Sequence, residues 1–406
     1  MLSTKTIKII KSTAQILANK GVDITSHFYE SMFNEHPELL HIFNHANQKK
    51  GRQQISLANT VYAAAQNIDQ LEVLLPKVKQ IAHKHRSLQI KAEHYPIVGK
   101  YLLKAIKEVL GDAATEDILD AWEEAYGVIA QVFIDVENEM YEEAAQQIGG
   151  WDGYRAFKVI RKQVESKCIT SFYLQPVDQG AIPHFKPGQY VTIRVQLPGE
   201  NYLSNRQYSL SDVPGKPYLR ISVKRENEHQ PEGKVSNYLH DQINVGHELE
   251  LTAPAGEFTL SEANENPIYF LSGGVGITPL LSMAKYVALH NPNRKLTFIH
   301  AAKDGKTRAF QEEIKQLMTT LKNGKSITFF SEPQKADRLH EDYDFKGFIK
   351  KEHLTEMITD QGIFYICGPV PFMKLMISYL NELGLHQSEV RYEFFGPAMA
   401  IEPATS

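Results

Sequence analysis

Apolar residues recur at steps of three or four along the first 145 residues, a spacing that predicts amphipathic helices. The expected helices cover 7–18, 24–33, 55–66, 73–84, 95–109 and 116–145, and one more begins at Pro37. In the last and longest stretch, Glu137 falls on the apolar stripe that carries Ile129 and Phe133. A carboxylate on that stripe is unusual, which makes Glu137 a candidate functional residue.

After Trp151 the pattern changes to alternating or β-branched runs separated by Pro-Gly turns. These runs predict strands at 158–164, 169–175, 189–196, 207–211 and 219–224, which suggest an antiparallel β-barrel. From about residue 266 the order becomes strand, turn, helix. Strands are expected at 267–271, 296–300, 327–330 and 362–367, and helices at 279–290, 309–321, 351–358 and 371–383. This alternation predicts an open parallel sheet.

Composition sharpens the division into domains. Only three of the 19 prolines fall within residues 1–149, and the other 16 fall in the remaining 257 residues. Because proline disrupts helix interiors, the count predicts a helical domain over 1–149. A barrel domain over 150–262 and a parallel-sheet domain over 263–406 follow. The hydrophobic content of 42% and the net charge of −4 are those of a globular protein with no electrostatic reason to bind nucleic acid.

Two cysteines and the N-terminal pattern indicate the compartment. Cys168 and Cys367 lie far apart in sequence and cannot form a disulfide framework or a zinc site. Lysines interrupt the N-terminal residues, so no signal peptide is expected, and no run reaches the roughly 20 apolar residues of a membrane helix. A cytoplasmic protein without an obligate membrane partner is expected.

The run Arg206-Gln207-Tyr208-Ser209 lies on an expected barrel strand and can clamp a flavin. Tyr208 can lie on the ring, Ser209 can hydrogen-bond it, and Arg206 can neutralise a pyrophosphate. Alone, a run of four such residues is a weak signal and is more often an ordinary strand. Tyr190, about 16 residues earlier in a Pro-Gly-Gln-Tyr run, is a second candidate contact.

Three glycine-containing segments suggest further phosphate and nucleotide contacts. Gly233–Ser236 lies just before a short expected helix, and Gly274–Pro279 joins a strand to a helix, so free backbone N–H groups can face a phosphate. Cys367-Gly368-Pro369 ends a buried strand, where open α/β sheets bind ligands.

These motifs, in this order, resemble the ferredoxin-NADP reductase family over residues 152 to about 397. The resemblance implies a FAD-binding β-barrel and a nicotinamide-binding α/β domain. It implies FAD contacts at Tyr190, Arg206, Gln207, Tyr208, Ser209, Gly233, Val235 and Ser236. It implies NAD(P)H contacts at Gly274, Val275, Gly276, Ile277, Thr278, Pro279, Cys367, Gly368 and Pro369. Lys303 and Arg308 can hold the 2′-phosphate of NADPH or can be solvated charges, which leaves the choice between NADH and NADPH open. The C-terminal segment resembles the part that covers the flavin, with Glu393, Phe395, Gly396 and Pro397 as expected contacts.

A reductase needs an electron acceptor, and a histidine on an apolar helix face suggests haem. Val78, Ile81, Ala82 and His85 share one stripe, whereas His83 lies about 140° from Val78 on a helical wheel. His85 is therefore the inward residue and the better candidate for an axial iron ligand. The alternative is an ordinary core histidine.

Besides His85, the helical part contains six residues whose order and spacing matter, although each also has an ordinary structural explanation: Tyr29, Phe43, Gln53, Leu57, Tyr95 and Glu137. Together they resemble the globin domain of flavohaemoglobins over residues 1–149. The resemblance implies His85 as the iron ligand, Tyr95 and Glu137 as the residues that orient it, and Lys84 near the gap between haem and flavin. On the distal side it implies Tyr29, Gln53 and Leu57, with Phe43 against the haem.

The resemblance implies a monomeric nitric oxide dioxygenase with haem b, FAD and NAD(P)H, in which two NO, two O2 and one NAD(P)H give two nitrate. Three alternatives stay open. They are an oxygen or NO sensor or store, a reductase of alkyl hydroperoxides, ferric chelates or quinones, and a haem-free flavin reductase.

Overall fold

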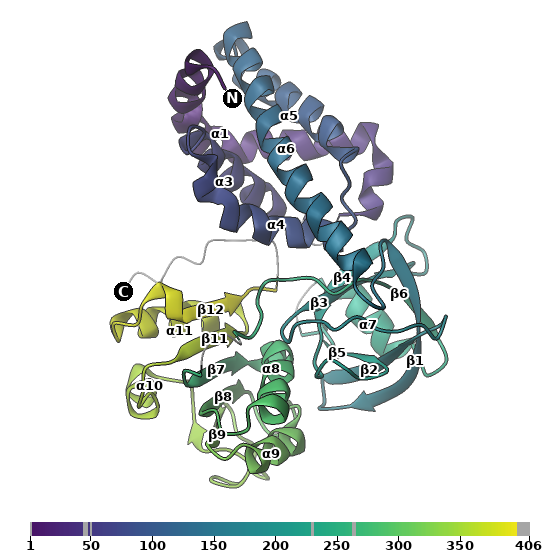
Figure 1. The fold of residues 1–406 in the computed structure, drawn as a ribbon, viewed down its shortest axis with the longest axis vertical. Helices are drawn as coiled ribbons and strands as arrows, with labels where there is room; N and C mark the ends of the chain where they lie inside the picture. The colour runs from purple at the N-terminus through teal and green to yellow at the C-terminus, as the bar shows by residue number, and fades with distance from the viewer. Residues whose placement is uncertain (1, 44–47, 49–50, 229–230, 262–264, 396–406) are drawn as a thin grey trace.

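The computed structural model describes residues 2–43, 48, 51–228, 231–261 and 265–395. Helices build the N-terminal part, drawn in purple and blue in Figure 1. They are α1 (Thr4–Glu35), α3 (Arg52–Gln66), α4 (Leu75–Ser87), α5 (His94–Leu110) and α6 (Glu116–Gln146). Short 3₁₀ helices lie between them, at η1 (Pro37–His41), η2 (Leu71–Leu74) and η3 (Gly111–Ala113). The two amphipathic stretches before residue 34 are one helix, and the helix expected from Pro37 is only the short η1.

Close packing of α1 against its neighbours organises this helical part. A Cβ on Gly21 would approach the Cβ of Ala58 within 3.2 Å, so the glycine lets α1 and α3 cross closely. Trp122 of α6 is buried and donates to the Thr13 hydroxyl of α1 at 3.1 Å. These contacts hold α3 and α6 against α1, and α5 also packs on α1. The apolar stripes meet in two adjacent cores: a large one around α1, and a smaller one that contains Val78, Tyr95, Ala130 and Phe133.

An antiparallel barrel follows, in the order β4-β3-β6-β1-β2-β5. The strands are β1 (Tyr154–Val164), β2 (Ile169–Pro176), β3 (Tyr190–Val195), β4 (Ser204–Ser209), β5 (Leu219–Lys224) and β6 (Glu248–Thr252). A bridge between Leu210 and Ile221 joins the two ends of the sheet. Helix α7 (Lys234–Asp241) lies between β5 and β6 in the chain. Strand β6 was not predicted, although Leu249 and Leu251 alternate with glutamates as in a half-buried strand.

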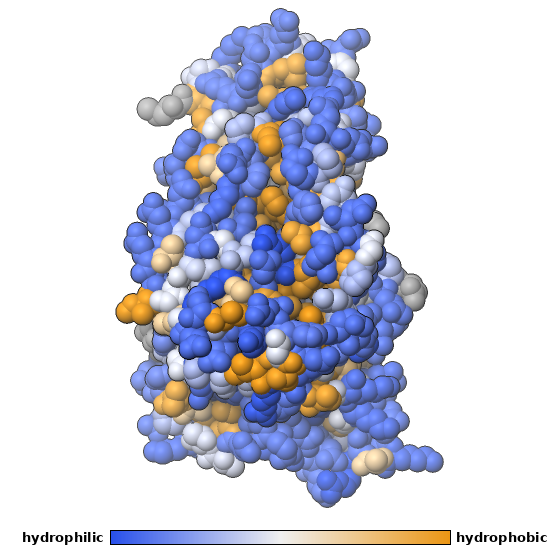
Figure 2. Space-filling model, turned by 90° about the vertical axis from the view of Figure 1, so that its right-hand side faces the viewer, coloured by the Kyte–Doolittle hydropathy of each residue, from blue (hydrophilic) through white to orange (hydrophobic). Residues whose placement is uncertain are grey.

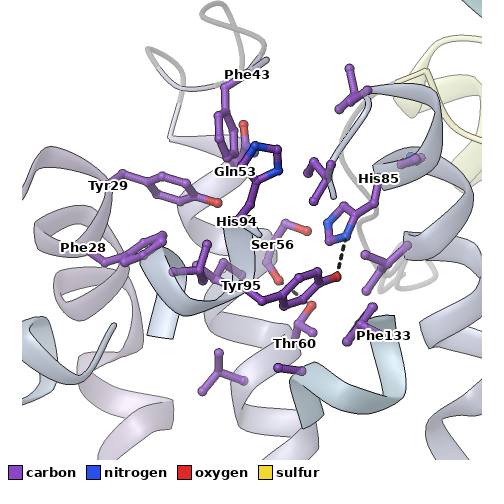
Figure 3. A pocket seen from close by; sticks show the side chains of 18 of the residues that line it. Phe28, Tyr29, Phe43, Gln53, Ser56, Thr60, His85, His94, Tyr95 and Phe133 are labelled. Carbon is purple, nitrogen blue, oxygen red and sulfur yellow. Dashed lines mark hydrogen bonds between the residues drawn. The ribbon is translucent and has the colours of Figure 1, made fainter. Parts of the chain in front are cut away.

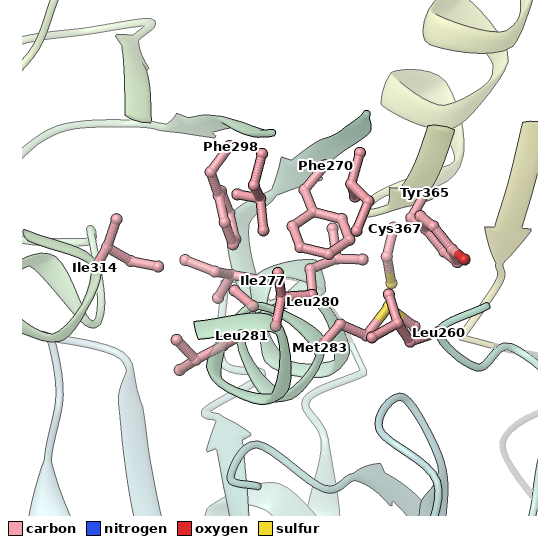
Figure 4. Packing of buried hydrophobic residues seen from close by; sticks show 14 of the residues in the cluster. Leu260, Phe270, Ile277, Leu280, Leu281, Met283, Phe298, Ile314, Tyr365 and Cys367 are labelled. Carbon is pink, nitrogen blue, oxygen red and sulfur yellow. The ribbon is translucent and has the colours of Figure 1, made fainter. Parts of the chain in front are cut away.

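The C-terminal part is a parallel sheet in the order β10-β9-β8-β7-β11-β12. Its strands are β7 (Ile268–Gly273), β8 (Leu296–Ala302), β9 (Gly324–Phe330), β10 (Phe345–Lys346), β11 (Ile363–Cys367) and β12 (Val390–Glu393). The helices are η4 (Gly274–Gly276), α8 (Ile277–His290), α9 (Gln311–Thr320), α10 (Lys351–Met357), α11 (Val370–Glu382) and η5 (Gln387–Glu389). Figure 4 shows α8 packed through Ile277, Leu280 and Met283 onto the sheet residues Phe270 and Tyr365.

The predicted fold class is confirmed: a helical domain, an antiparallel barrel and a parallel α/β sheet follow one another. Side-chain hydrogen bonds join the helices to the barrel. Arg86 donates to the Pro254 carbonyl at 2.5 Å, and Gln207 donates to the Ser87 hydroxyl at 2.7 Å. On the face seen in Figure 2, polar residues predominate and apolar side chains lie in scattered groups. Within the described residues, no helix combines the length and apolarity needed to cross a membrane.

Candidate functional site

A cavity of about 410 Å³ lies inside the helical part and extends to the barrel and the C-terminal strand β12. Most of its lining is apolar, and Figure 3 shows aromatic rings and the imidazoles of His85 and His94 around it. Thirteen of the residues predicted for the site line this single space. They are Tyr29, Phe43, Gln53, Leu57, Lys84, His85, Tyr95, Tyr190, Arg206, Gln207, Ser209, Glu393 and Phe395.

His85 projects from α4 and is held by a buried carboxylate of α6. Its Nδ1 lies 2.7 Å from Oε1 of Glu137, whose side chain is only 3% exposed. The Tyr95 hydroxyl donates to the same oxygen at 2.7 Å. Because a carboxylate only accepts, we assign the imidazole proton to Nδ1, which leaves the Nε2 lone pair available. Burial, reinforced by Glu137, raises the pKa of Tyr95, so its hydroxyl keeps its proton.

Tyr29 lies across the cavity from His85 among aromatic rings (Figure 3). Its ring contacts Phe43 edge-on, with centroids 5.9 Å apart, and lies 4.7 Å from Phe28. Burial raises the pKa of Tyr29, and a hydrogen bond with Gln53 opposes this rise. The phenol is therefore a neutral donor positioned by Gln53 from α3.

Lys84 and Glu393 line the cavity where the helical part meets β12. Burial lowers the pKa of Lys84, while Glu393 opposes that change. Burial also raises the pKa of Glu393 to about 7, against the opposing effect of Lys84. The buried Cys367 thiol at the end of β11 has a raised pKa through burial and then through Glu393, so it stays protonated. The junction therefore contains a buried lysine whose pKa is lowered and a carboxyl group whose pKa lies near neutrality.

The flavin-type run lies on β4 as predicted, but only part of it faces the cavity. Arg206, Gln207 and Ser209 line the space, and Tyr190 on β3 pairs with Ser209 in the sheet. Tyr208 instead packs against the barrel core. Alternation along β4 puts Gln207 and Ser209 on one face and Tyr208 on the other, the face that it shares with Arg206.

The Gly233 segment is the start of α7 rather than a loop before it. The Ser236 hydroxyl donates to the Gly233 carbonyl at 2.9 Å and accepts from the Glu226 N–H at 3.2 Å. Its proton is thus already used within the protein. Val235 is buried in the barrel core, and the Gly233 N–H donates to the Glu226 carbonyl at 2.7 Å. Of the predicted contacts in this segment, only the backbone N–H groups of Val235 and Ser236 are therefore left for a phosphate.

The glycine-rich turn between β7 and α8 combines an open position with a crowded one. Gly274 has a φ of +54°, and a Cβ there would meet nothing within 4 Å. A Cβ on Gly276 would collide with the Cys367 carbonyl, 2.3 Å away. Glycine at 276 lets the turn lie against Cys367-Gly368-Pro369, and glycine at 274 leaves the backbone open to a ligand. Ile277 is buried, and the Thr278 hydroxyl donates to the Val275 carbonyl at 3.0 Å.

The two cations considered for a 2′-phosphate both have partners. Arg308 is buried and donates to the Asp342 carbonyl at 2.5 Å, so it is not a solvated charge. Lys303 pairs with Glu332 at 3.3 Å. Gly396 and Pro397 lie outside the described residues.

Comparison with known proteins agrees with this arrangement. Three family models match consecutive parts of the chain: Globin over residues 26–133, Oxidoreductase FAD-binding domain over 156–260, and Oxidoreductase NAD-binding domain over 270–377. Flavohemoproteins of Bacillus thuringiensis and Bacillus subtilis are 54% and 49% identical to it, each over 99% of this chain and 100% and 99% of their own length. The chain belongs to the flavohaemoprotein family.

Solved structures support the family assignment. A flavohemoglobin from Malassezia yamatoensis, solved with bound FAD and heme, has a TM-score of 0.86 at 29% identity, covering 97% of this chain and all of that one. The FAD/NAD-binding domain of a nitric oxide dioxygenase from Vibrio cholerae has a TM-score of 0.55 at 37% identity, covering 60% of this chain and 99% of its own. The predicted cofactors are thus confirmed at the level of the domains that bind them, and the chain is an oxidoreductase with a nicotinamide-binding domain.

Several residues that shape the site in this flavohaemoprotein were not predicted. Ser87 accepts the Gln207 hydrogen bond, and Asn205 donates to the carbonyls of His41 and Ile42 at 2.9 and 3.0 Å. A second histidine, His94, also lines the cavity. The position of His94 directly before Tyr95 could have marked it as a cavity residue. No sequence pattern could have marked Ser87 and Asn205, because their hydrogen-bond partners lie more than 100 residues away along the chain.

Proposed function

We propose that this chain is a nitric oxide dioxygenase, which converts NO and O2 to nitrate with electrons from NAD(P)H. Two NO, two O2 and one NAD(P)H give two nitrate ions, one NAD(P)⁺ and one proton, so atoms and charge balance. The family assignment and the likeness of the reductase part to the Vibrio cholerae nitric oxide dioxygenase domain support the proposal.

The residues around the cavity fit a haem. The space is mainly apolar and contains the His85 imidazole, whose Nδ1 is occupied by Glu137 and whose Nε2 is available as a ligand. The open backbone at Gly274 and the Arg206 side chain fit the phosphates of nucleotide cofactors. When bound, haem supplies an iron centre for oxygen chemistry, and FAD supplies a carrier that accepts electrons in pairs and releases them singly.

The observation that carries the proposal is the buried carboxylate behind His85. Glu137 is only 2% exposed and accepts two hydrogen bonds at 2.7 Å. It holds the Nδ1 proton and makes the imidazole a stronger electron donor, which favours oxygen activation over simple oxygen storage. In this role Tyr95 and Glu137 orient and polarise His85.

Residues on the opposite wall act on the oxygen substrate. Tyr29 donates a hydrogen bond into the cavity where negative charge develops, and Gln53 keeps the phenol in place. Leu57 and Phe43 restrict the volume and exclude water. In the proposal, this wall stabilises charge in the transition state while NO enters the same small space.

The reductase residues supply electrons to this cavity. Tyr190, Arg206, Gln207 and Ser209 bind the flavin, and Lys84 and Glu393 set the charge between the two redox sites. The first turn of α7 and the backbone at Gly274–Thr278 bind phosphates. The continuity of one cavity from Tyr29 to Glu393 supports direct transfer between adjacent sites. The cytoplasmic location and the monomeric state stay predictions.

The decisive experiment follows the products of one defined reaction. The holoprotein is reduced with NAD(P)H without oxygen, then exposed to O2 and finally to NO, and nitrate, nitrite and nitrous oxide are measured. We expect nitrate as the main product and one NAD(P)H oxidised for every two NO. Nitrite or nitrous oxide as the main aerobic product would refute the proposal. An oxygen store would release O2 unchanged and would consume no NAD(P)H.

A further inference from the structure

Four charged residues form a closed ring between the barrel and the parallel-sheet domain. Arg220 and Asp212 come from the barrel, and Lys285 of α8 and Glu313 of α9 come from the other domain. Lys285 lies 2.8 Å from Asp212 and 2.6 Å from Glu313. Arg220 lies 2.9 Å from Glu313 and 4.0 Å from Asp212. Charge alternates around the ring, so each group has two partners of opposite sign.

The ring is largely withdrawn from water. The side chain of Arg220 is 2% exposed, that of Asp212 9% and that of Lys285 14%, while Glu313 at 28% forms the outer edge. Burial alone would raise the pKa of Asp212, but Arg220 and Lys285 outweigh it and lower that pKa. Buried ion pairs of this kind add little net stability compared with apolar residues of the same size, because the charges lose their hydration. A gain in fixed geometry explains them better than a gain in stability.

Asp212 connects strand β4, which lines the cavity, with helix α8, which follows the glycine-rich turn. It follows Ser209, the cavity-lining end of β4, by three residues. Its backbone carbonyl accepts from the Ser282 hydroxyl of α8 at 2.7 Å, and its side chain pairs with Lys285 of the same helix. Ser282 lies only five residues after the start of α8 at Ile277, about 7.5 Å along the axis. Helix α8 lies between the sheet and the barrel in Figures 1 and 4.

The backbone at the start of α9 adopts an unfavourable conformation. Phe310 is buried and has a φ of +61°, the left-handed region that bulky residues avoid. Its ring lies 5.4 Å from the Arg220 guanidinium, and Glu313 follows it by three residues. Such strain persists only where surrounding contacts determine the conformation. The position of Glu313 against Arg220 is therefore imposed by the interface between the domains.

We propose that the ring of Asp212, Arg220, Lys285 and Glu313 is a positioning device for hydride transfer from NAD(P)H to FAD. It fixes the glycine-rich turn before α8, which takes the nucleotide pyrophosphate, relative to the strand that holds the flavin. None of the four residues touches the reacting atoms in this role. The inference rests on the proposed function only for the step from NAD(P)H to FAD.

Lys285→Met tests the proposal, because it removes one of the four charges of the ring and keeps an unbranched side chain only one atom shorter. Misplacement by about 1 Å can cost about a hundredfold in rate. We therefore expect the limiting rate of flavin reduction by NADH, measured by stopped-flow absorbance without O2 or NO, to fall ten- to hundredfold. The long-wavelength charge-transfer absorbance of nicotinamide stacked on flavin should weaken in parallel. Lys285→Arg, which keeps the charge, should restore both.

A structural role alone would not produce this combination. The matched control Lys351→Met breaks an exposed pair with Glu382 in the same domain and should leave the rate and the absorbance band unchanged. In holoprotein without nucleotide, Lys285→Met should speed hydrogen exchange of the amides at Gly274–Thr278. If Lys285→Met does not accumulate as folded protein, Glu313→Gln provides the same measurements from the outer edge of the ring.

Two results would overturn the inference. One is an unchanged limiting rate and band in both Lys285→Met and Glu313→Gln. The other is a higher KM for NADH with an unchanged limiting rate, since this would make the ring a binding aid without influence on the transfer geometry. Because no NO is used, failure of the dioxygenase proposal would leave these measurements interpretable, and the reverse also holds.

Discussion

Replacing Glu137 with glutamine removes the charge behind His85 while keeping the shape of the side chain. Oε1 of Glu137 accepts two hydrogen bonds at 2.7 Å, one from His85 and one from Tyr95. A hydrogen bond to a charged acceptor contributes about 1.5–3 kcal/mol and a neutral one about 0.5–1.5 kcal/mol. The change therefore weakens the two bonds by about 2–3 kcal/mol in total.

Part of this loss should appear in the oxygen chemistry. Removing an outer partner of a metal-binding histidine typically costs about ten- to hundredfold, which equals about 1.4–2.7 kcal/mol in the activation barrier. We expect Glu137→Gln to slow NO consumption by the reduced, oxygen-exposed protein by this factor in a stopped-flow assay. Reduction of FAD by NADH should be unchanged, because the reductase motifs lie on other domains.

Three controls make the result interpretable. Tyr95→Phe removes one of the two hydrogen bonds but keeps the carboxylate, so its effect should be smaller than that of Glu137→Gln. Asp135→Asn changes an exposed acid on the same helix and should have no effect. Haem content and the thermal unfolding temperature show whether each variant is folded. Full NO consumption by folded Glu137→Gln with its haem would refute the proposed role of the carboxylate.

Other variants test the remaining assignments. His85→Ala should lose haem whereas His94→Ala, the second histidine in the cavity, should retain it; absorbance at the Soret band decides between them. Tyr29→Phe should release O2 about ten- to hundredfold faster, the loss of one hydrogen bond to a charged group, while NADH-driven reduction of an artificial acceptor is unchanged; an unaltered off-rate would contradict contact with the ligand. Burial lowers the pKa of His300 to about 3, below the unfolded value of about 6.5. Its contribution to stability is therefore complete above pH 6.5 and is lost as the pH falls toward 3. His300→Asn should make stability fall less steeply with acid, by the binding of about one proton fewer on unfolding, and the exposed control His386→Asn should not. Unfolding temperatures measured over a range of pH test this difference.

The order of elements was predictable because it depends on local chemistry. Helical spacing predicted α3, α4, α5 and α6 within a few residues, since a buried stripe requires it. The same spacing distinguished His85 from His83 and marked Glu137 as an inward carboxylate. Strand β6 was missed because only five residues with two leucines carry its pattern. The helix expected from Pro37 ended as a short 3₁₀ turn, whose length no periodicity predicts.

Contacts between distant parts of the chain were not predictable in this way. Nothing in the sequence indicates that Ser87 meets Gln207, or that Lys285 and Glu313 meet Asp212 and Arg220. Such pairs depend on how the domains are placed, and exposed and buried charges look alike in a sequence. Arg308 illustrates this. From the sequence it could be a solvated charge or a phosphate ligand, and in the structure it is buried and donates to the Asp342 carbonyl.

The sequence by itself thus determined the three-part architecture, the family and the residue types of the site, because periodicity and turn chemistry are local properties of the chain. The tertiary structure decided which side chains share one space. It turned Tyr208 and Val235 toward the barrel core, used the Ser236 proton internally and joined the Tyr29 and Glu393 walls into a single cavity. These outcomes follow from packing and desolvation, which act between residues that the chain keeps far apart until it folds.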